Sequence, residues 1–128
     1  MQVNEKTANL KVKIKDFFKK WIEFTTPFHK LNGRQQKVLA LLLYHHYTFK
    51  KEITNNKILW KAVFDYDTKV DIYTELNMTS ASLENIISQL RKSKVIIDNQ
   101  ITPVYIPELA NNSKKFSIHF NFLLNYEN

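Results

Sequence analysis

The chain has 128 residues, no cysteine and a formal net charge of +7 at pH 7, and its length suits one domain with a single core. The lack of cysteine excludes disulfides and thiolate metal sites, and no apolar run approaches the roughly 20 residues that span a bilayer. The N-terminal residues lack the apolar segment of a secretory signal, so we expect an intracellular protein without membrane contact. Its nine Phe, six Tyr and two Trp predict a packed globule and argue against disorder.

The positive charge lies in the first half of the chain. Residues 1–61 hold thirteen Lys or Arg against four Asp or Glu, whereas residues 62–128 hold six against eight. A basic balance indicates an anionic partner such as nucleic acid. Seventeen of the nineteen basic residues are Lys, and thirteen residues are Asn, which is typical of an AT-rich genome. Coding bias and solubility therefore offer a second explanation for the lysine excess.

Residues 10–25 fit two patterns of secondary structure. Apolar residues alternate with lysine up to Ile14, as they do in a strand. Apolar and aromatic residues also recur at helical spacing across the same stretch. We predict a short strand that ends at Ile14, with Asp16 as the N-cap of a helix over 17–25. Pro27 blocks continuation of this helix.

Capping residues and apolar stripes predict four further helices. Asn32 and Gln35 match the capping box, and the other N-caps that we predict are Thr54 or Asn55, Asp67, and Thr79 or Ser80. The run from Val38 to Leu43 is apolar on every side, which predicts a buried central helix. Asn77 suits the left-handed position that ends a helix. The predicted helices cover residues 33–51, 55–64, 68–76 and 80–93.

Strand signals dominate the C-terminal part of the chain. Residues 95–107 are rich in β-branched side chains, and Asp98-Asn99-Gln100 predicts a tight turn. Pro103 and Pro107 restrict these residues to edge positions. An alternating pattern predicts a second strand with four side chains facing inward, namely Phe116, Ile118, Phe120 and Phe122. We therefore predict a β-wing over 95–122, closed by a loop over 108–115.

Residues 33–123 resemble the winged helix-turn-helix family, because a helix, a short turn, a capped second helix and a hydrophobic hairpin follow in that order. We predict an α+β fold, mainly helical, with a C-terminal β-wing and a short N-terminal strand. Residues 1–32 form an arm with the strand and first helix, and 124–128 form a tail. The stretch FFKKWIEFTTPFHKLNGRQQKVLALLLYHHY also resembles a small conserved protein of crAss-like bacteriophages, in which a Pro-Phe-His segment precedes a Leu-rich helix. That resemblance spans residues 16–123 and implies a phage origin.

The winged-helix resemblance implies that the second helix of the motif enters the major groove of DNA and that the wing contacts the backbone. The residues carried over are Ser80, Ser82, Asn85, Ser88, Gln89, Arg91 and Lys92 on the helix, with Lys114 and Lys115 in the wing. Asn and Gln side chains read adenine, Ser reads several bases, and Arg91 suits a phosphate. A second basic surface is predicted from Lys11, Lys13, Lys15, Lys19, Lys20, Lys30, Arg34 and Lys37.

Protein contact is the alternative to DNA contact. Winged helices also act as protein adaptors. Glu84, Asp71 and Glu75 make the helix-turn-helix segment acidic, which disfavours a surface that faces phosphates. The chain then serves as a structural or assembly component of a phage virion, instead of a regulator in the host cytoplasm. For either role we expect a homo-oligomer or a place in a larger assembly.

Enzyme and metal signatures are missing from the sequence. Adjacent histidines on a helix, as in His45-His46, diverge by about 100° and do not readily share one ion. Gly33 is the single glycine, which excludes Gly-rich phosphate-binding loops, and no hydrolase motif occurs. We predict a non-enzymatic protein that uses no metal, cofactor or small-molecule substrate and binds DNA or other phage proteins.

Overall fold

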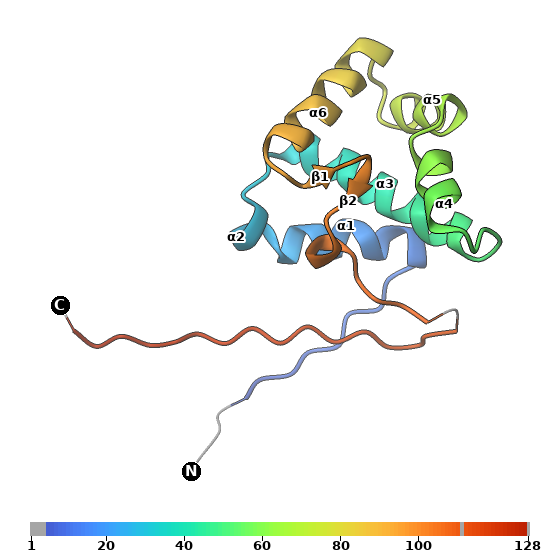
Figure 1. The fold of residues 1–128 in the computed structure, drawn as a ribbon. Helices are drawn as coiled ribbons and strands as arrows, with labels where there is room; N and C mark the ends of the chain where they lie inside the picture. The colour runs from blue at the N-terminus through green and yellow to red at the C-terminus, as the bar shows by residue number, and fades with distance from the viewer. Residues whose placement is uncertain (1–4, 111, 128) are drawn as a thin grey trace.

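The computed structural model describes residues 5–110 and 112–127, so residues 1–4 of the predicted arm, residue 111 of the predicted loop and residue 128 of the tail lie outside it. The described residues form a mainly helical α+β fold with a small antiparallel hairpin (Figure 1). The elements are α1 (Ile14–Phe24), α2 (Thr26–His29), α3 (Gly33–Lys50), α4 (Asn56–Val63), α5 (Tyr66–Glu75), α6 (Ser80–Lys92), β1 (Ile96–Ile97), β2 (Gln100–Ile101) and the 3-10 helix η1 (Pro103–Tyr105).

Helix α3 is the centre of the fold, as the apolar run predicts. All six residues from Val38 to Leu43 are buried, and α1, α4, α5 and α6 pack on this helix. The capping box is confirmed: Asn32 Oδ1 accepts a hydrogen bond from the Gln35 backbone N–H at 2.9 Å, and Gln35 Oε1 accepts one from the Asn32 N–H at 3.0 Å. Both donors belong to a helix start that lacks intrahelical partners, so the box fixes where α3 begins.

The predicted N-terminal strand is wrong. Described residues up to Lys13 form no strand, and α1 begins at Ile14 with Lys13 as its N-cap. Asp16 is therefore not the cap but lies in the first turn, where its negative charge suits the positive end of the helix dipole. A strand at this position would need a neighbouring strand to pair with. A helix instead buries Phe18 and Ile22 in the core, so the helical conformation is the more stable one.

The helix-turn-helix segment forms as α5 and α6, and two of its predicted signals are confirmed. Asn77 has a positive φ of 52°, and Thr79 Oγ1 caps α6 by accepting the Ser82 N–H at 3.1 Å. The predicted cap Asp67 is wrong, because α5 begins at Tyr66 and Asp67 lies in its first turn. Figure 1 shows α5 nearly along its axis and α6 from the side, so the two helices cross steeply.

The hairpin is much shorter than the predicted wing. Ile96 pairs with Ile101 and Ile97 with Gln100. Asp98 and Asn99 have φ values of 53° and 54°, as a type I′ hairpin turn requires. The predicted turn is therefore confirmed.

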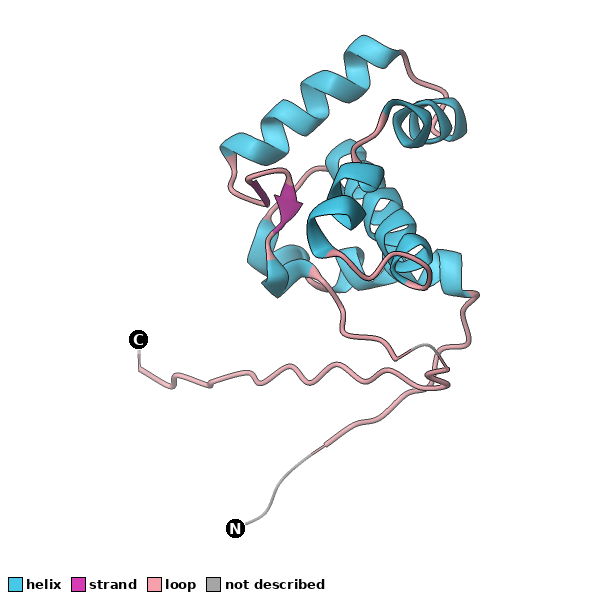
Figure 2. Cartoon of the chain, turned by 45° about the vertical axis from the view of Figure 1, so that its right-hand side comes forward, coloured by secondary structure: helices cyan, strands magenta, loops and turns pink. Residues whose placement is uncertain are grey.

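The wing over 95–122 is wrong beyond the hairpin. Pro103 lacks an N–H to continue the ladder, and η1 begins there. Residues 112–127 contain no strand. The predicted second wing strand does not form because no neighbouring strand in the described chain pairs with it. Ile118 is half-buried as expected of an inward residue, whereas Phe122 is 86% exposed. Figure 2 shows this segment as an extended loop beside the helical body.

Candidate nucleic-acid interface

Helix α6 presents one face to solvent and buries the other. Leu83, Ile86, Ile87 and Leu90 are buried in the core, as predicted. The predicted DNA-binding residues of this helix are all at least partly accessible: Ser80, Asn85, Arg91 and Lys92 are exposed, and Ser82, Ser88 and Gln89 are half-buried. Helical spacing places Asn85, Ser88 and Lys92 in one stripe, because they lie three and four residues apart. The structure therefore brings Asn85, Ser88 and Lys92 onto one accessible face of α6, whereas Ser82 and Arg91, nine residues apart, lie on opposite flanks of the helix.

Three of these side chains, those of Ser82, Gln89 and Arg91, already have partners within the protein. The Ser82 hydroxyl accepts a hydrogen bond from Thr79 at 3.0 Å as part of the cap of α6. Arg91 Nη2 donates to Asn99 Oδ1 in the hairpin turn at 3.2 Å. Asn85, Ser88 and Lys92, in contrast, make no side-chain hydrogen bond to the rest of residues 5–110 and 112–127. The stripe from Asn85 to Lys92 is thus the part of the helix that is open to a ligand.

Gln35 joins the beginning of α3 to the end of α6, a role that sequence reasoning did not assign to it. Its Nε2 donates to Gln89 Oε1 at 2.9 Å, while its own Oε1 completes the capping box. One amide therefore ties two helix ends together. The signal in the sequence is a capping-box Gln, which keeps a free NH2 group after capping, but the partner 54 residues away is not predictable from it.

A basic corner forms where these two helix ends meet. Because Gln35 contacts Gln89, the beginning of α3 lies beside the end of α6 (Figure 1). Arg34 precedes Gln35 directly, Lys92 is the last residue of α6, and Lys94 follows it by two residues. All three are exposed, and none of them forms a salt bridge within the described residues. We call Arg34, Lys92 and Lys94 the basic corner. Arg34 and Lys37 belong to the predicted second basic surface, but the fold places the first turn of α3, and Arg34 with it, beside α6. Lys37 is exposed two residues after Gln35, so it points away from the contact with Gln89.

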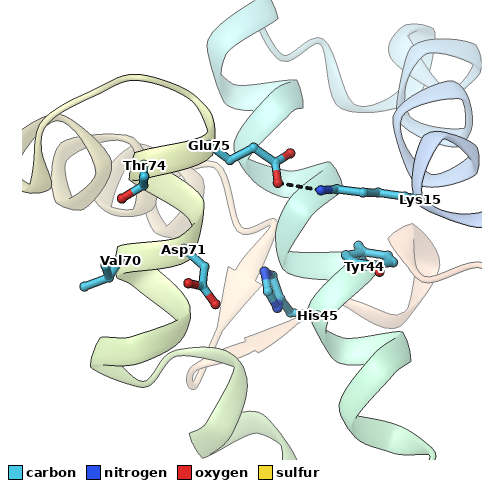
Figure 3. Close-up of a pocket in the computed structure, with 7 residues that line it drawn as sticks. All are labelled: Lys15, Tyr44, His45, Val70, Asp71, Thr74 and Glu75. Atoms are coloured by element: carbon cyan, nitrogen blue, oxygen red, sulfur yellow. Dashed lines mark hydrogen bonds and ion pairs between the residues drawn. The ribbon is translucent and has the colours of Figure 1, made fainter.

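Two of the three acidic side chains that argue against DNA contact lie away from α6. Glu84 pairs with Lys69 of α5 at 2.9 Å. Glu75 pairs with Lys15 of α1 at 2.6 Å, and its hydrogen bond raises the pKa of Lys15. Asp71 lies in the same groove as that pair (Figure 3). Asp71 and Glu75 therefore lie in the groove beside α1 and α3, away from α6. Glu84 stays exposed on α6 one turn before Ser88, and its ion pair with Lys69 offsets its charge there.

The remaining predicted basic residues do not form one surface. Lys11 and Lys13 lie on the extended N-terminal segment, and Lys20 pairs with Glu23 at 3.3 Å. Lys15 belongs to the ion pair with Glu75, Lys19 is exposed on α1, and Lys30 is exposed after α2 with a φ of 57°. The predicted wing residues Lys114 and Lys115 are exposed on the extended C-terminal segment and not on the hairpin. The turn of the hairpin instead carries Asp98, which disfavours contact with phosphates.

An open groove of about 480 Å³ lies between α1, α3 and α5. Its lining residues are Lys15, Tyr44, His45, Val70, Asp71, Thr74 and Glu75 (Figure 3). Burial lowers the pKa of His45, so the ring is neutral at pH 7. Lys15 and Glu75 already neutralise each other across the groove. Among the described residues no group of three or more His, Cys, Asp or Glu is placed to hold a metal ion.

His29 is a structural residue whose role the sequence did not reveal. Its Nε2 bonds to the Ile22 carbonyl at 2.7 Å, and its Nδ1 accepts the Leu31 N–H at 3.0 Å. This pattern assigns the neutral tautomer with the proton on Nε2. The buried ring thereby connects the last turns of α1 to the segment that leads into α3, and the Pro27-Phe28-His29 sequence makes the short helix α2 that places it.

Comparison with known proteins gives no match to a protein-family model, a curated protein or a solved structure. None of the helices in the described ranges combines the length and hydrophobicity that a bilayer crossing requires. The winged-helix and crAss-like phage resemblances therefore stay predictions, and the geometry of α6 and the basic corner is the basis for a functional proposal.

Proposed function

We propose that the protein binds duplex DNA, with α6 in the major groove and the basic corner on the phosphate backbone. The observation that carries the proposal is the open stripe Asn85–Ser88–Lys92, which lies beside cations that have no ion-pair partner among the described residues. Polar side chains on an exposed helix read base edges, and lysine and arginine next to them position the helix on the backbone. The role needs no catalysis and no cofactor.

The two amides of the predicted reading face have different tasks in this proposal. Asn85 is exposed, and its carbonyl and NH2 groups are both available to the N6 and N7 atoms of adenine. Gln89 Oε1 accepts a hydrogen bond from Gln35 Nε2 at 2.9 Å, so the main effect of Gln89 is to hold α6 against α3. Asn85 is therefore the base-reading residue, and Gln89 is a positioning residue.

Phosphate contact comes from the basic corner and not from the hairpin. A two-residue pairing with Asp98 in its turn offers little reach and the wrong charge. Arg34 is exposed at the beginning of α3, and Lys92 and Lys94 are exposed at the end of α6, so all three extend the contact beyond the groove. A winged helix with so small a wing depends on its recognition helix and on the residues around that helix.

The test is a titration of fluorescent duplex DNA at several salt concentrations. Each lost phosphate contact lowers the slope of log K against log salt by about 0.9, so Lys92→Ala and Arg34→Ala each reduce the slope by about one unit. Lys19→Ala is the matched control, since Lys19 is equally exposed but lies on α1. Selection from random duplexes with Asn85→Ala then shows altered preference at one base pair. Absence of binding at low salt, or equal effects of Lys19→Ala and Lys92→Ala, contradicts the proposal.

A second candidate function is that of an assembly component in a phage virion. The exposed apolar side chains of the C-terminal segment favour it, since large exposed apolar patches mark protein contacts. The crAss-like resemblance adds the expectation of a phage-encoded protein, acting either in the host cytoplasm or in the virion. Mass spectrometry of purified virions separates the two roles, because a structural component occurs there in a fixed copy number.

A further inference from the structure

The C-terminal segment carries an apolar row whose last three members are exposed. Phe122, Leu124 and Tyr126 are 86%, 72% and 88% exposed. They continue the alternation that begins at Phe116, so every even-numbered residue from Phe116 to Tyr126 is apolar or aromatic. The row includes Ile118 and Phe120. Figures 1 and 2 show the segment running past α1 and beyond the helical body.

The backbone of this segment is equally without partners. It is extended, and among the described residues no backbone hydrogen bond joins residues 114–126 to another part of the chain. An extended edge of this kind is a template for pairing with another strand. Residues 116–126 contain no Lys, Arg, Asp, Glu, Gly or Pro, so neither charge repulsion nor a missing N–H prevents two such edges from approaching.

Two side chains of the row already pack on the helices. The Phe116 ring contacts Phe17 and Trp21 edge to face, with centroids 5.2 and 5.6 Å apart. The Phe120 ring stacks on Phe28 of α2 with centroids 6.0 Å apart. The surface around these contacts remains apolar and accessible, because Phe28 is 68% exposed. The C-terminal segment therefore packs on α1 and α2, and a second strand can pair along its free edge.

We propose that residues 116–126 of two copies pair as antiparallel strands and form a homodimer. The occupant is a second copy because the segment is uncharged and self-complementary. Pairing about Asn121 places Phe116 opposite Tyr126 and Phe120 opposite Phe122, so both apolar rows share one face. The row offers on the order of 600 Å² per copy, at 150–250 Å² for each buried aromatic side chain. Two copies thus reach about 1,200 Å², the lower bound for a specific interface.

The N-terminal segment does not fit this role. Its apolar residues also alternate, but Lys11 and Lys13 lie between them. Two copies paired along that segment bring like charges together, which destabilises cross-strand pairs. An acidic partner protein suits the N-terminal segment better than the C-terminal one, since residues 116–126 have no cation to attract it. Self-pairing is therefore specific to the C-terminal segment, and it does not depend on DNA binding.

Sedimentation equilibrium of the full chain tests the dimer. We expect a mass of twice 15.3 kDa at micromolar concentration, and at least about 100-fold weaker association for Phe122→Ser with Leu124→Ser, because each copy then loses two apolar contacts. Ile58→Ser is the matched control: Ile58 is 57% exposed on α4 and leaves the dimer intact. A wild-type chain that stays monomeric, or equal weakening by the control, overturns the proposal. Circular dichroism shows that each variant remains folded.

Single cysteines test the register, since the chain has no cysteine of its own. In the proposed pairing Asn121 opposes its own copy, with Cα atoms about 5 Å apart, which suits a disulfide. Ser117 and its copy lie about 27 Å apart, eight residues along the ladder. Asn121→Cys therefore forms a covalent dimer on oxidation, and Ser117→Cys does not. Equal cross-linking of both variants, or of neither, overturns this register.

Discussion

His46 makes the stability of the fold depend on pH. It lies on α3, is only 7% exposed and stacks on Trp60 with ring centroids 4.3 Å apart. Burial and, to a smaller extent, the positive charge of Lys50 lower the pKa of His46 to about 4, and Glu108 opposes both effects. The folded protein therefore holds this ring neutral at a pH where the same ring in the unfolded chain is charged.

The sign and size of the effect follow from proton linkage. The pKa of His46 is about 4 in the folded chain and about 6.5 in the unfolded chain. As the pH falls below about 6.5, the unfolded chain gains a proton that the folded chain does not, so stability decreases. Between about pH 7.5 and about pH 5 the loss is about 2 kcal/mol, and below pH 4 it approaches about 3 kcal/mol.

Urea denaturation at the two pH values measures this loss. Far-UV circular dichroism is the suitable signal, because a protonated ring stacked on Trp60 also quenches tryptophan fluorescence. His46→Phe keeps an aromatic ring on Trp60 and removes the titrating group, so most of the pH-dependent loss disappears. A small remainder is expected from His45, whose pKa is also lowered by burial.

The control is His119→Phe, since His119 is exposed on the C-terminal segment. This variant should lose as much stability between the two pH values as the wild type does. If His46→Phe keeps the full loss of about 2 kcal/mol, then burial of His46 is not the source of the pH dependence. The same conclusion follows if the wild-type chain is equally stable at both pH values.

Two further predictions concern single stabilising contacts. His29→Ala leaves the buried Leu31 N–H without its partner and removes the shortest side-chain hydrogen bond to the Ile22 carbonyl, which keeps the Thr25 and Thr26 hydroxyls at 3.2 and 3.4 Å. We therefore expect about 2 kcal/mol lower free energy of unfolding in urea; an unchanged midpoint refutes the bridging role. Thr79→Ala removes the cap of α6 and lowers the same free energy by about 1 kcal/mol, whereas Thr79→Asp retains the cap and should restore most of it.

The helices are predictable from the sequence because their signals are local. Asn32, Asn55 and Thr79 cap α3, α4 and α6 as their side chains and positions indicate. The burial of Leu39 follows from a run that is apolar on every side, and the burial of Ile87 follows from a stripe that repeats every three to four residues. Each of these features depends on neighbours within a few positions, so tertiary context rarely reverses it.

The strands are less predictable because they depend on a partner. The alternation near Ile14 and the one from Phe116 to Phe122 are both strand patterns, yet neither segment has a neighbouring strand within the described chain. Helix formation competes successfully at Ile14, where the same residues also match a helical stripe. At Phe116 no helical pattern competes, so the chain remains extended. A sequence pattern states which conformation suits a segment, but not whether a partner exists to stabilise it.

The sequence predicts which residues of α6 are exposed, but it does not predict which other residues surround them. Asn85 and Lys92 follow from the buried stripe of α6, because exposed positions are those that the stripe leaves over. The basic corner arises from a contact between Gln35 and Gln89, 54 residues apart. The pairing of Glu75 with Lys15 spans 60 residues. Such long-range contacts change which charges surround a site, and residue spacing carries no information about them.

The two proposed surfaces are compatible because they lie on opposite sides of the body. Both views place α6 on one side and the C-terminal segment on the other, with α1 between them (Figures 1 and 2). Pairing through residues 116–126 thus leaves both copies of α6 open. If α6 binds DNA as proposed, one such helix beside so short a hairpin contacts few base pairs, and helix-turn-helix proteins gain affinity by joining two such helices. In the proposed dimer the second copy of α6 would then bind at high effective concentration, which compensates for the small contact area of the hairpin.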